Sequence, residues 1–300
     1  MLAKLCANLT HGQADTYGLV LASSGLKYSV KQTADGWEIW VAESSHPKAL
    51  NLITEYSREN QHVVLTDEPE TPQHKKTYTG LWASVLLLAC HIASTMANTP
   101  DTFIKLYGSS ASDILNGEVY RTVTSLMLHS GYVHLVGNMA GLAIFGTAVC
   151  NLNGGGAGLL MILLSGIIGN LVNAVLFEYG HMSIGASTAV FGAVGILTAY
   201  QFYSKIRIHG RRKKAWIPLA GGLVLLGLLG SGVRSDLTAH LFGFMAGIGL
   251  GMVHVVYLKQ FINKRHQAYC LAITIGTIIL AWVSPQLSVN KMKKLWIILN

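Results

Sequence analysis

The sequence has few charged residues. Asp, Glu, Lys and Arg make up 12% of its 300 residues, whereas hydrophobic residues make up 51%, and the mean hydropathy is +0.42. This composition is not typical of a soluble domain and indicates a membrane protein. The formal net charge is +8. Because many of the basic residues lie in short loops beside apolar runs, they favour contact with anionic membrane lipids and argue against nucleic-acid binding.

Paired cysteines and targeting signals are also missing. Cys6, Cys90, Cys150 and Cys270 are single and widely separated, so no spacing predicts a zinc site or a redox motif, and we interpret them as free thiols. The residues after Met1 soon become polar, so we expect no signal peptide. An Arg-rich, acid-poor leader is absent as well, which favours a bacterial plasma membrane over mitochondria.

Residues 1–62 predict a small soluble α/β domain in the cytoplasm. A short helix is expected at 14–22, two strands at 27–42 joined at an Asp-Gly turn, and a helix at 46–60 that begins with a His-Pro pair. Residues 63–78 are polar and contain two prolines, as in an exposed linker. No chemistry follows for this domain, so a regulatory or partner-binding role and a passive extension both stay open.

Long apolar runs dominate the rest of the chain. They lie at about 79–97, 133–151, 157–177, 187–203, 215–231, 237–257 and 268–284. Each run is close to the length, about 20 residues, that crosses the hydrocarbon core of a bilayer. We therefore predict an all-α polytopic membrane protein, with a six-helix core at 79–258 and a C-terminal loop, seventh helix and tail at 259–300.

Basic residues predict the orientation. Lysines at 75–76, six basic residues within 205–214 and three within 259–265 all fall on one side of seven spans, which places the amino terminus in the cytoplasm. The lysines within 291–294 would then lie outside, against this tendency, so a core of six spans with a seventh run that does not cross stays open. The long loop at 98–129 predicts short amphipathic pieces in the interface plane.

Two polar residues open two of these runs. Ser187 follows Gly185-Ala186 at the start of the fourth run, and His240 opens the sixth, with glycines three and seven residues later on its own face. Small residues on one face let helices approach closely in lipid, so we expect the imidazole to meet the hydroxyl and activate it as a nucleophile. Asp236 is interpreted as a cap or loop residue. Taken alone, Ser187 is better explained as a helix N-cap, and it is the combination with His240 and with the His/Asn pair of the second run that favours catalysis.

His134 and Asn138 are four residues apart and share one face of the second run. Two donors aimed at one point suit a developing oxyanion, although polar residues in spans also tie helices together. A metal site is the competing use of His129, His134 and His240. Because the first two are five residues apart and face different directions, and no nearby acid or cysteine completes a shell, we expect neither a metal nor another cofactor.

These motifs together resemble the rhomboid intramembrane serine proteases. The resemblance covers about 79–258. Its motifs are Gly185-Ala186-Ser187, the Ala-His-x-x-Gly-x-x-x-Gly pattern from Ala239 to Gly247, the pattern formed by His129, His134 and Asn138, and the pair Tyr120-Arg121. Each motif alone is weak, but their order and spacing across separate runs are specific.

The resemblance implies a role for each residue. Ser187 is the nucleophile, His240 its general base and later the acid, and His134 and Asn138 form the oxyanion hole with the Ser187 backbone N–H. In the family the position of Phe191 packs under the imidazole. The resemblance also gives His129 a structural or water-organising role, and Arg121 would hold the first loop at the interface. Thr188, Phe191 and Tyr120 replace the glycine, tyrosine and tryptophan of many members, and none of these changes removes a catalytic group.

The resemblance implies an intramembrane endopeptidase whose substrates are transmembrane proteins. We expect a hydrophilic cavity lined by Ser187, His240, His134 and Asn138, with Asn170 and Asn173 close by. Two other classes stay open: a catalytically inactive membrane chaperone of the same fold, and a transporter, which the lack of an internal repeat disfavours. The physiological substrate and the oligomeric state do not follow from the sequence.

Overall fold

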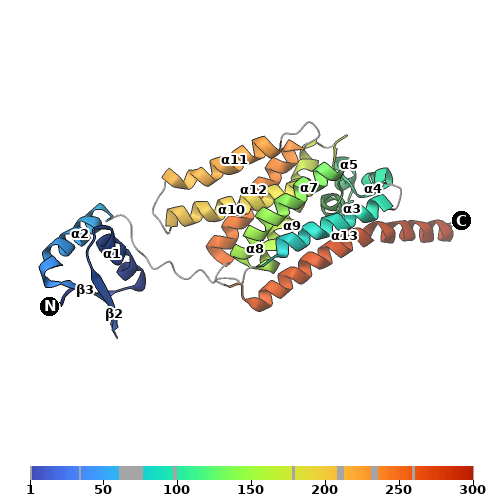
Figure 1. The fold of residues 1–300 in the computed structure, drawn as a ribbon. Helices are drawn as coiled ribbons and strands as arrows, with labels where there is room; N and C mark the ends of the chain where they lie inside the picture. Colours follow the sequence, from blue (N-terminus) through green and yellow to red (C-terminus); the bar gives the residue numbers. More distant parts are fainter. Residues whose placement is uncertain are drawn as a thin grey trace. The chain divides into compact units, whose positions relative to one another are not determined.

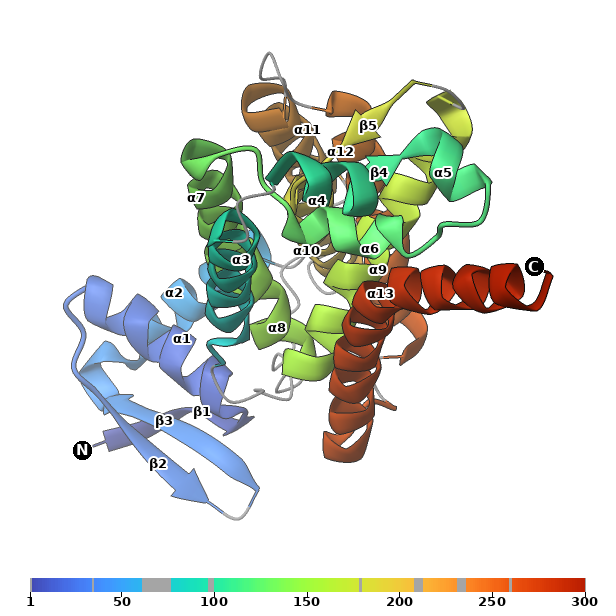
Figure 2. The same cartoon turned by 90° about the vertical axis from the view of Figure 1, so that its right-hand side faces the viewer.

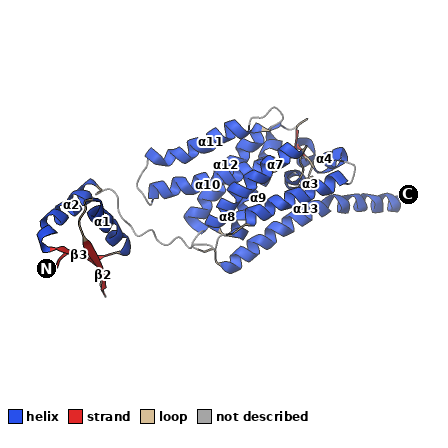
Figure 3. Ribbon diagram, viewed as in Figure 1, coloured by secondary structure: helices blue, strands red, loops and turns tan. Residues whose placement is uncertain are grey.

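The computed structural model describes residues 2–33, 35–60, 77–96, 100–177, 180–207, 213–230, 236–258 and 261–299. The chain forms two compact units, the first mainly from residues 1–72 and the second from residues 73–205 and 212–300. Apart from its last two residues, the expected linker at 63–78 lies outside the described ranges. Longer strands occur in the first unit, and helices make up nearly all of the second (Figure 3).

The first unit is an antiparallel sheet packed against two helices. Its elements are β1 (Leu2–Leu9), α1 (His11–Ser23), β2 (Tyr28–Thr33), β3 (Gly36–Ala42), the short helix η1 (Glu43–Ser45) and α2 (His46–Glu59). β3 lies between β1 and β2, and its Ile39 and Val41 are fully buried with Leu21 of α1 and Ile53 of α2. The predicted hairpin and second helix are therefore present.

Strand β1 was missing from the sequence prediction. Its pairing with β3 shifts in register between Lys4 and Cys6 and again between Cys6 and Leu9. Such irregularities disturb the alternation of inward and outward side chains that identifies a strand in a sequence. Helix α1 is also longer than predicted, because Thr10 and Gln13 form a capping box that starts it at His11.

The second unit is a helical bundle (Figure 1). Its long helices are α3 (Thr79–Met96), α7 (Tyr132–Gly141) continued by η3 (Leu142–Gly146) and α8 (Thr147–Asn153), α9 (Gly155–Phe177), α10 (Ser187–Arg207), α11 (Trp216–Gly230), α12 (Leu237–Val253) continued by η5 (His254–Leu258), and α13 (Lys264–Leu299). The shorter elements are α4 (Pro100–Tyr107), β4 (Ser109–Ser110), α5 (Ala111–Leu115), α6 (Arg121–Thr124), η2 (Ser125–Met127), β5 (Met182–Ser183) and η4 (Lys213–Ala215).

Five helical segments of the described residues are long and apolar enough to cross a membrane. They are Thr79–Met96, Tyr132–Asn153, Gly155–Phe177, Leu237–Leu258 and Lys264–Pro285. The apolar part of α11 is shorter, at Trp216–Leu228, and α10 is not among the candidates. Helix α10 is buried over most of Thr188 to Ala199, so neighbouring helices rather than lipid surround that stretch. The protein is an integral multi-pass membrane protein, and the count of seven spans stays a prediction.

Helix α9 lies at the centre of the bundle and packs against α8, α12 and α13. The short elements that follow α3 gather at one end of the bundle, together with β5 (Figure 2). There β4 pairs with β5, so the loop predicted at 98–129 is joined to the segment that leads into α10. This loop consists of short helical pieces, as expected.

Arg121 organises the interior of that loop. Its side chain is only 6% exposed and forms ion pairs with Glu118 at 2.6 Å and Asp113 at 3.2 Å. Its guanidinium also donates to the carbonyl oxygens of Lys105 and Gly108, at 2.8 and 3.1 Å. These contacts connect parts of the loop to one another, and the expected role of Arg121 in holding the loop at the membrane interface stays a prediction.

Candidate active site

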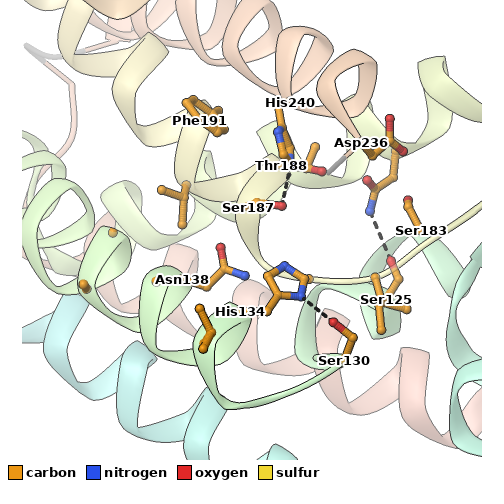
Figure 4. Close-up of a pocket in the computed structure, with 18 of the residues that line it drawn as sticks. Ser125, Ser130, His134, Asn138, Ser183, Ser187, Thr188, Phe191, Asp236 and His240 are labelled. Carbon is orange, nitrogen blue, oxygen red and sulfur yellow. Dashed lines mark hydrogen bonds between the residues drawn. The ribbon is translucent and has the colours of Figure 1, made fainter. Parts of the chain in front are cut away.

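Ser187 and His240 meet although 53 positions separate them in the sequence. Ser187 is the first residue of α10, and His240 lies in the first turn of α12, which Asp236 caps. The Nε2 atom of His240 is 2.7 Å from the Oγ atom of Ser187, as Figure 4 shows. This is a hydrogen-bonding distance between a hydroxyl and an imidazole, the geometry that a serine nucleophile and its base require.

Glycines allow the two helices to come this close. A Cβ atom on Gly243 would overlap the carbonyl oxygen of Thr188, and one on Gly247 would overlap the backbone of Gly192. Backbone atoms cannot turn away as a flexible side chain can, so any larger residue would push α12 away from α10. The glycine spacing after His240 therefore has the packing role that the sequence predicted.

Phe191 lies one turn after Ser187 and packs against the imidazole. The ring centroids of Phe191 and His240 are 5.0 Å apart, with 32° between the ring planes. Both residues are 5% exposed. Contact with an aromatic ring limits rotation of the imidazole and keeps Nε2 directed at Ser187.

His134 and Asn138 of α7 lie on the opposite side of Ser187 from His240 (Figure 4). Asn138 is 5% exposed, and its Nδ2 group is buried without a hydrogen-bond partner among the residues that the structure describes. A buried donor without a partner carries a free-energy cost, which is repaid when an acceptor enters the pocket. His134 Nδ1 lies 3.3 Å from the Oγ atom of Ser130.

Gly185 makes room for these two side chains. A Cβ atom at this position would lie 2.5 Å from Nε2 of His134 and 3.3 Å from Nδ2 of Asn138. The residue also has a φ angle of 121°, which side chains other than hydrogen rarely tolerate. Its N–H donates to the carbonyl oxygen of Ser125 at 2.9 Å, which holds the segment before Ser187 against η2.

His129 is buried next to His134. Their ring centroids are 5.1 Å apart, and His129 is 7% exposed. Neither ring nitrogen of His129 has a hydrogen-bond partner within the described part of the chain. This ring contact fits a structural role in which His129 supports His134. The role of His129 as an organiser of water stays a prediction.

A cavity of about 1100 Å³ connects these residues. Ser187, His240, His134, Asn138 and Asn170 all line it. Asn173 does not line the cavity, but it lies close by, as expected, because its Nδ2 group donates at 2.9 Å to Asp236, which does line it. No group of three or more His, Cys, Asp or Glu residues that could hold a metal ion occurs in the described ranges.

Two polar contacts at the cavity were not predicted from the sequence. Ser130 contacts His134, and His181 contacts Asp236, whose side chain was interpreted only as a cap. The Ser130 contact could have been found, because four residues separate the pair. His181 lies in a short segment without periodicity, and its partner is 55 positions away, so no sequence pattern identifies it.

Comparisons with known proteins identify similar sequences. Residues 116–257 match the family model named rhomboid domain. The chain is 32% identical over 142 residues to the rhomboid protein YdcA of Bacillus subtilis, a match that covers 47% of this chain and 70% of YdcA. It is 31% identical over 159 residues to the rhomboid protease GluP of Bacillus subtilis, covering 52% of this chain and 30% of GluP.

Inactive relatives are also similar. The chain is 30% identical over 161 residues to inactive rhomboid protein 2 of Homo sapiens, covering 52% of this chain and 19% of the human protein. The chain thus spans less than two thirds of the length of two of these three relatives. Similarity alone therefore does not distinguish an active protein from an inactive one, and the geometry of the site carries that argument.

Proposed function

Because the chain belongs to the rhomboid family, we propose that it is an intramembrane serine endopeptidase that cuts peptide bonds in or near transmembrane segments of other membrane proteins. The observation that carries this proposal is the 2.7 Å contact between Ser187 Oγ and His240 Nε2. It lies in a cavity whose opposite wall holds the Asn138 Nδ2 donor, which has no hydrogen-bond partner in the described part of the chain. The activity belongs to the helical core within 79–258.

In the first step, Ser187 Oγ attacks the carbonyl carbon of the substrate peptide bond, and His240 Nε2 takes the hydroxyl proton. The carbonyl oxygen becomes an oxyanion. His134, Asn138 and the backbone N–H of Ser187 would donate hydrogen bonds to it. Ser187 begins α10, and the first N–H groups of a helix have no acceptor within the helix, so this N–H suits a negative charge.

In the second step, the tetrahedral intermediate collapses. The carbon–nitrogen bond breaks, the proton on His240 passes to the leaving amine, and the new amino end departs. The acyl group stays on Ser187 until a water molecule, deprotonated by His240, attacks it. The bond between the acyl carbon and Ser187 Oγ then breaks, His240 returns the proton to Oγ, and the new carboxyl end is released. Phe191 would hold the imidazole in place through both steps.

Hydrolysis within a bilayer needs both water and an unpaired stretch of substrate backbone, which lipid does not tolerate. The cavity of about 1100 Å³ supports the proposal because polar side chains of its lining, among them Ser187, His134 and Asn138, could hold both. The substrate would be a transmembrane helix that unwinds locally at the cavity. The basic loops favour an orientation with the amino terminus in the cytoplasm, so the cavity would open toward the outer face.

The test is labelling of the detergent-solubilised protein with a fluorophosphonate, which reacts with activated serines. We expect labelling of the wild type and none of Ser187→Ala or His240→Ala. A reporter with one transmembrane segment, reconstituted with the same three proteins, should be cut by the wild type only. Equal labelling of all three proteins would overturn the proposal. A folded wild type that is neither labelled nor active would place the chain with the inactive relatives.

A further inference from the structure

A second side-chain bridge connects the segment of Ser187 to the helix of His240. The Nε2 atom of His181 is 2.6 Å from Oδ2 of Asp236, and Asn173 of α9 donates to the same oxygen at 2.9 Å. His181 and Asp236 both line the cavity that holds Ser187 and His240. The bridge therefore lies beside the site, and its residues are not among those that react.

Asp236 controls the position of the first turn of α12. Its Oδ1 atom accepts hydrogen bonds from the Ala239 amide at 3.0 Å and the Thr238 hydroxyl at 2.9 Å. Its backbone carbonyl accepts from the His240 amide at 3.1 Å. A displacement of Asp236 would thus move the backbone of His240 with it.

His181 is held in place by the first loop and by α9. Its carbonyl oxygen accepts from the Ala111 amide at 3.0 Å, and the next two residues form β5, which pairs with β4. Four residues after β5 the chain reaches Ser187. The His181 ring stacks on Phe177, with centroids 4.8 Å apart and 23° between the planes, so its direction toward Asp236 is restricted.

The chemistry of the pair gives the contact a direction. Burial by itself would raise the pKa of the Asp236 carboxyl, but the hydrogen bonds from Ala239, His181 and Thr238 outweigh it and hold this pKa below its ordinary value. An ionised carboxylate only accepts hydrogen bonds. The Nε2 atom of His181 therefore carries a hydrogen and donates a hydrogen bond to the carboxylate. Hydrogen bonds to a charged group are stronger than those between neutral groups.

We infer that His181 is a positioning residue, which ties the serine segment to the first turn of α12 and thereby keeps Nε2 of His240 within hydrogen-bonding distance of Ser187. This inference rests on the proposed proteolytic function. The 2.7 Å contact and the glycine packing of α12 against α10 already connect the two sides of the site. The contact of His181 with Asp236 adds a further tie, six residues before Ser187 and four before His240.

Two substitutions separate this role from simple packing. His181→Gln loses the ring, but its amide nitrogen is as many bonds from Cβ as Nε2 of histidine, so it can still donate to Asp236. His181→Phe keeps the stack on Phe177 and loses the donor. A positioning role predicts that the glutamine variant works and the phenylalanine variant does not. A packing role predicts the reverse.

The experiment measures the second-order rate of fluorophosphonate labelling of Ser187, with the thermal unfolding temperature of each detergent-solubilised variant. We expect His181→Phe to be labelled about 10- to 100-fold more slowly than the wild type, the loss typical of one hydrogen bond to a charged group. His181→Gln should stay within about threefold of the wild-type rate, because its donor is retained. The matched control is His11→Phe, because His11 also pairs with an aspartate, Asp15, at 3.1 Å and contacts an aromatic ring, that of Trp37.

If His181→Phe does not fold, Asp236→Asn serves instead, because asparagine still caps a helix but lacks the charge that receives the bond from His181. It should slow labelling in the same range. Wild-type rates in both His181→Phe and Asp236→Asn, or a glutamine variant as slow as a folded phenylalanine variant, would overturn the inference. Absence of labelling in the wild type would instead contradict the proposed protease activity, so the two failures are distinguishable.

Discussion

The close approach of α10 and α12 makes Gly247→Ala the most informative perturbation of this fold. Gly247 lies two turns after His240 on the same face of α12 and does not line the cavity. The substitution adds one methyl group and no charge, and alanine favours a helix more than glycine does. Any loss of activity must therefore come from the distance between the two helices.

The expected displacement follows from the contacts of the added atom. A Cβ on Gly247 would lie 2.9 Å from the Cα atom and 2.8 Å from the carbonyl carbon of Gly192. Carbon atoms in contact prefer about 3.5 to 4.0 Å, so the helices must separate by roughly 1 Å. The contact of 2.7 Å between Ser187 and His240 then lengthens to about 3.7 Å, which is too long for a hydrogen bond.

A misplacement of about 1 Å at reacting atoms costs roughly 100-fold in rate. We expect Gly247→Ala to reduce the fluorophosphonate labelling rate and the reporter cleavage rate by about this factor, and to destabilise the fold by about 1 to 3 kcal/mol through overpacking. The matched control is Gly249→Ala in the same helix, because a Cβ there meets no atom within 4 Å. It should keep the wild-type rate.

Equal rates for the Gly247 and Gly249 variants, with both proteins folded, would refute the argument that glycine contacts set the distance between the serine and the histidine. A double variant offers a further check. Adding Gly249→Ala to Gly247→Ala should leave the loss unchanged, since the control position has no contact to couple with.

Two further predictions concern the oxyanion donors and the first loop. Asn138→Ala should reduce turnover of the reporter by about 100- to 1000-fold, as for other oxyanion donors, while the unfolding temperature changes little, because its Nδ2 has no partner among the described residues. An unfolding temperature that falls with activity would assign Asn138 to structure instead. Arg121→Lys should lower the free energy of unfolding by about 1 to 3 kcal/mol for each buried polar group left unpaired, and the unfolding temperature with it. The reason is that a lysine cannot serve Glu118, Asp113 and two carbonyl oxygens together. An unchanged unfolding temperature, measured with a thiol-reactive dye or by scattering, would contradict the role given to that guanidinium.

The order of the segments could be predicted from local patterns. Apolar runs, the Asp-Gly turn and the helix at 46–60 depend on residues that are neighbours in the chain, so their spacing is enough to identify them. The same holds for His134 and Asn138, which share a helix face because four residues separate them. The motif around Ser187 and the glycines after His240 predicted the residues of the site and the close approach of their helices.

Local spacing could not identify contacts between distant segments. The bridge from His181 to Asp236 spans 55 positions, and nothing in a short polar segment indicates which helix end it reaches. Helix α10 is a second case in which local pattern is not enough. Its burial among neighbouring helices lets it keep polar residues, which lower its hydropathy below that of a typical span. The strand β1 was missed because its pairing with β3 shifts in register twice, which disturbs the alternation of side chains that identifies a strand in a sequence.

The sequence by itself determined the class of the protein, the family that it resembles and the side chains able to carry the chemistry, because these depend on residue type and short-range periodicity. Only the tertiary structure decided the 2.7 Å contact between Ser187 and His240, the place of Asn138 beside them in one cavity and the tie through His181. Each of these is a distance between atoms on different helices or loops. Such distances are set by the packing of whole segments, in which a single methyl group on Gly247 would move one wall of the site.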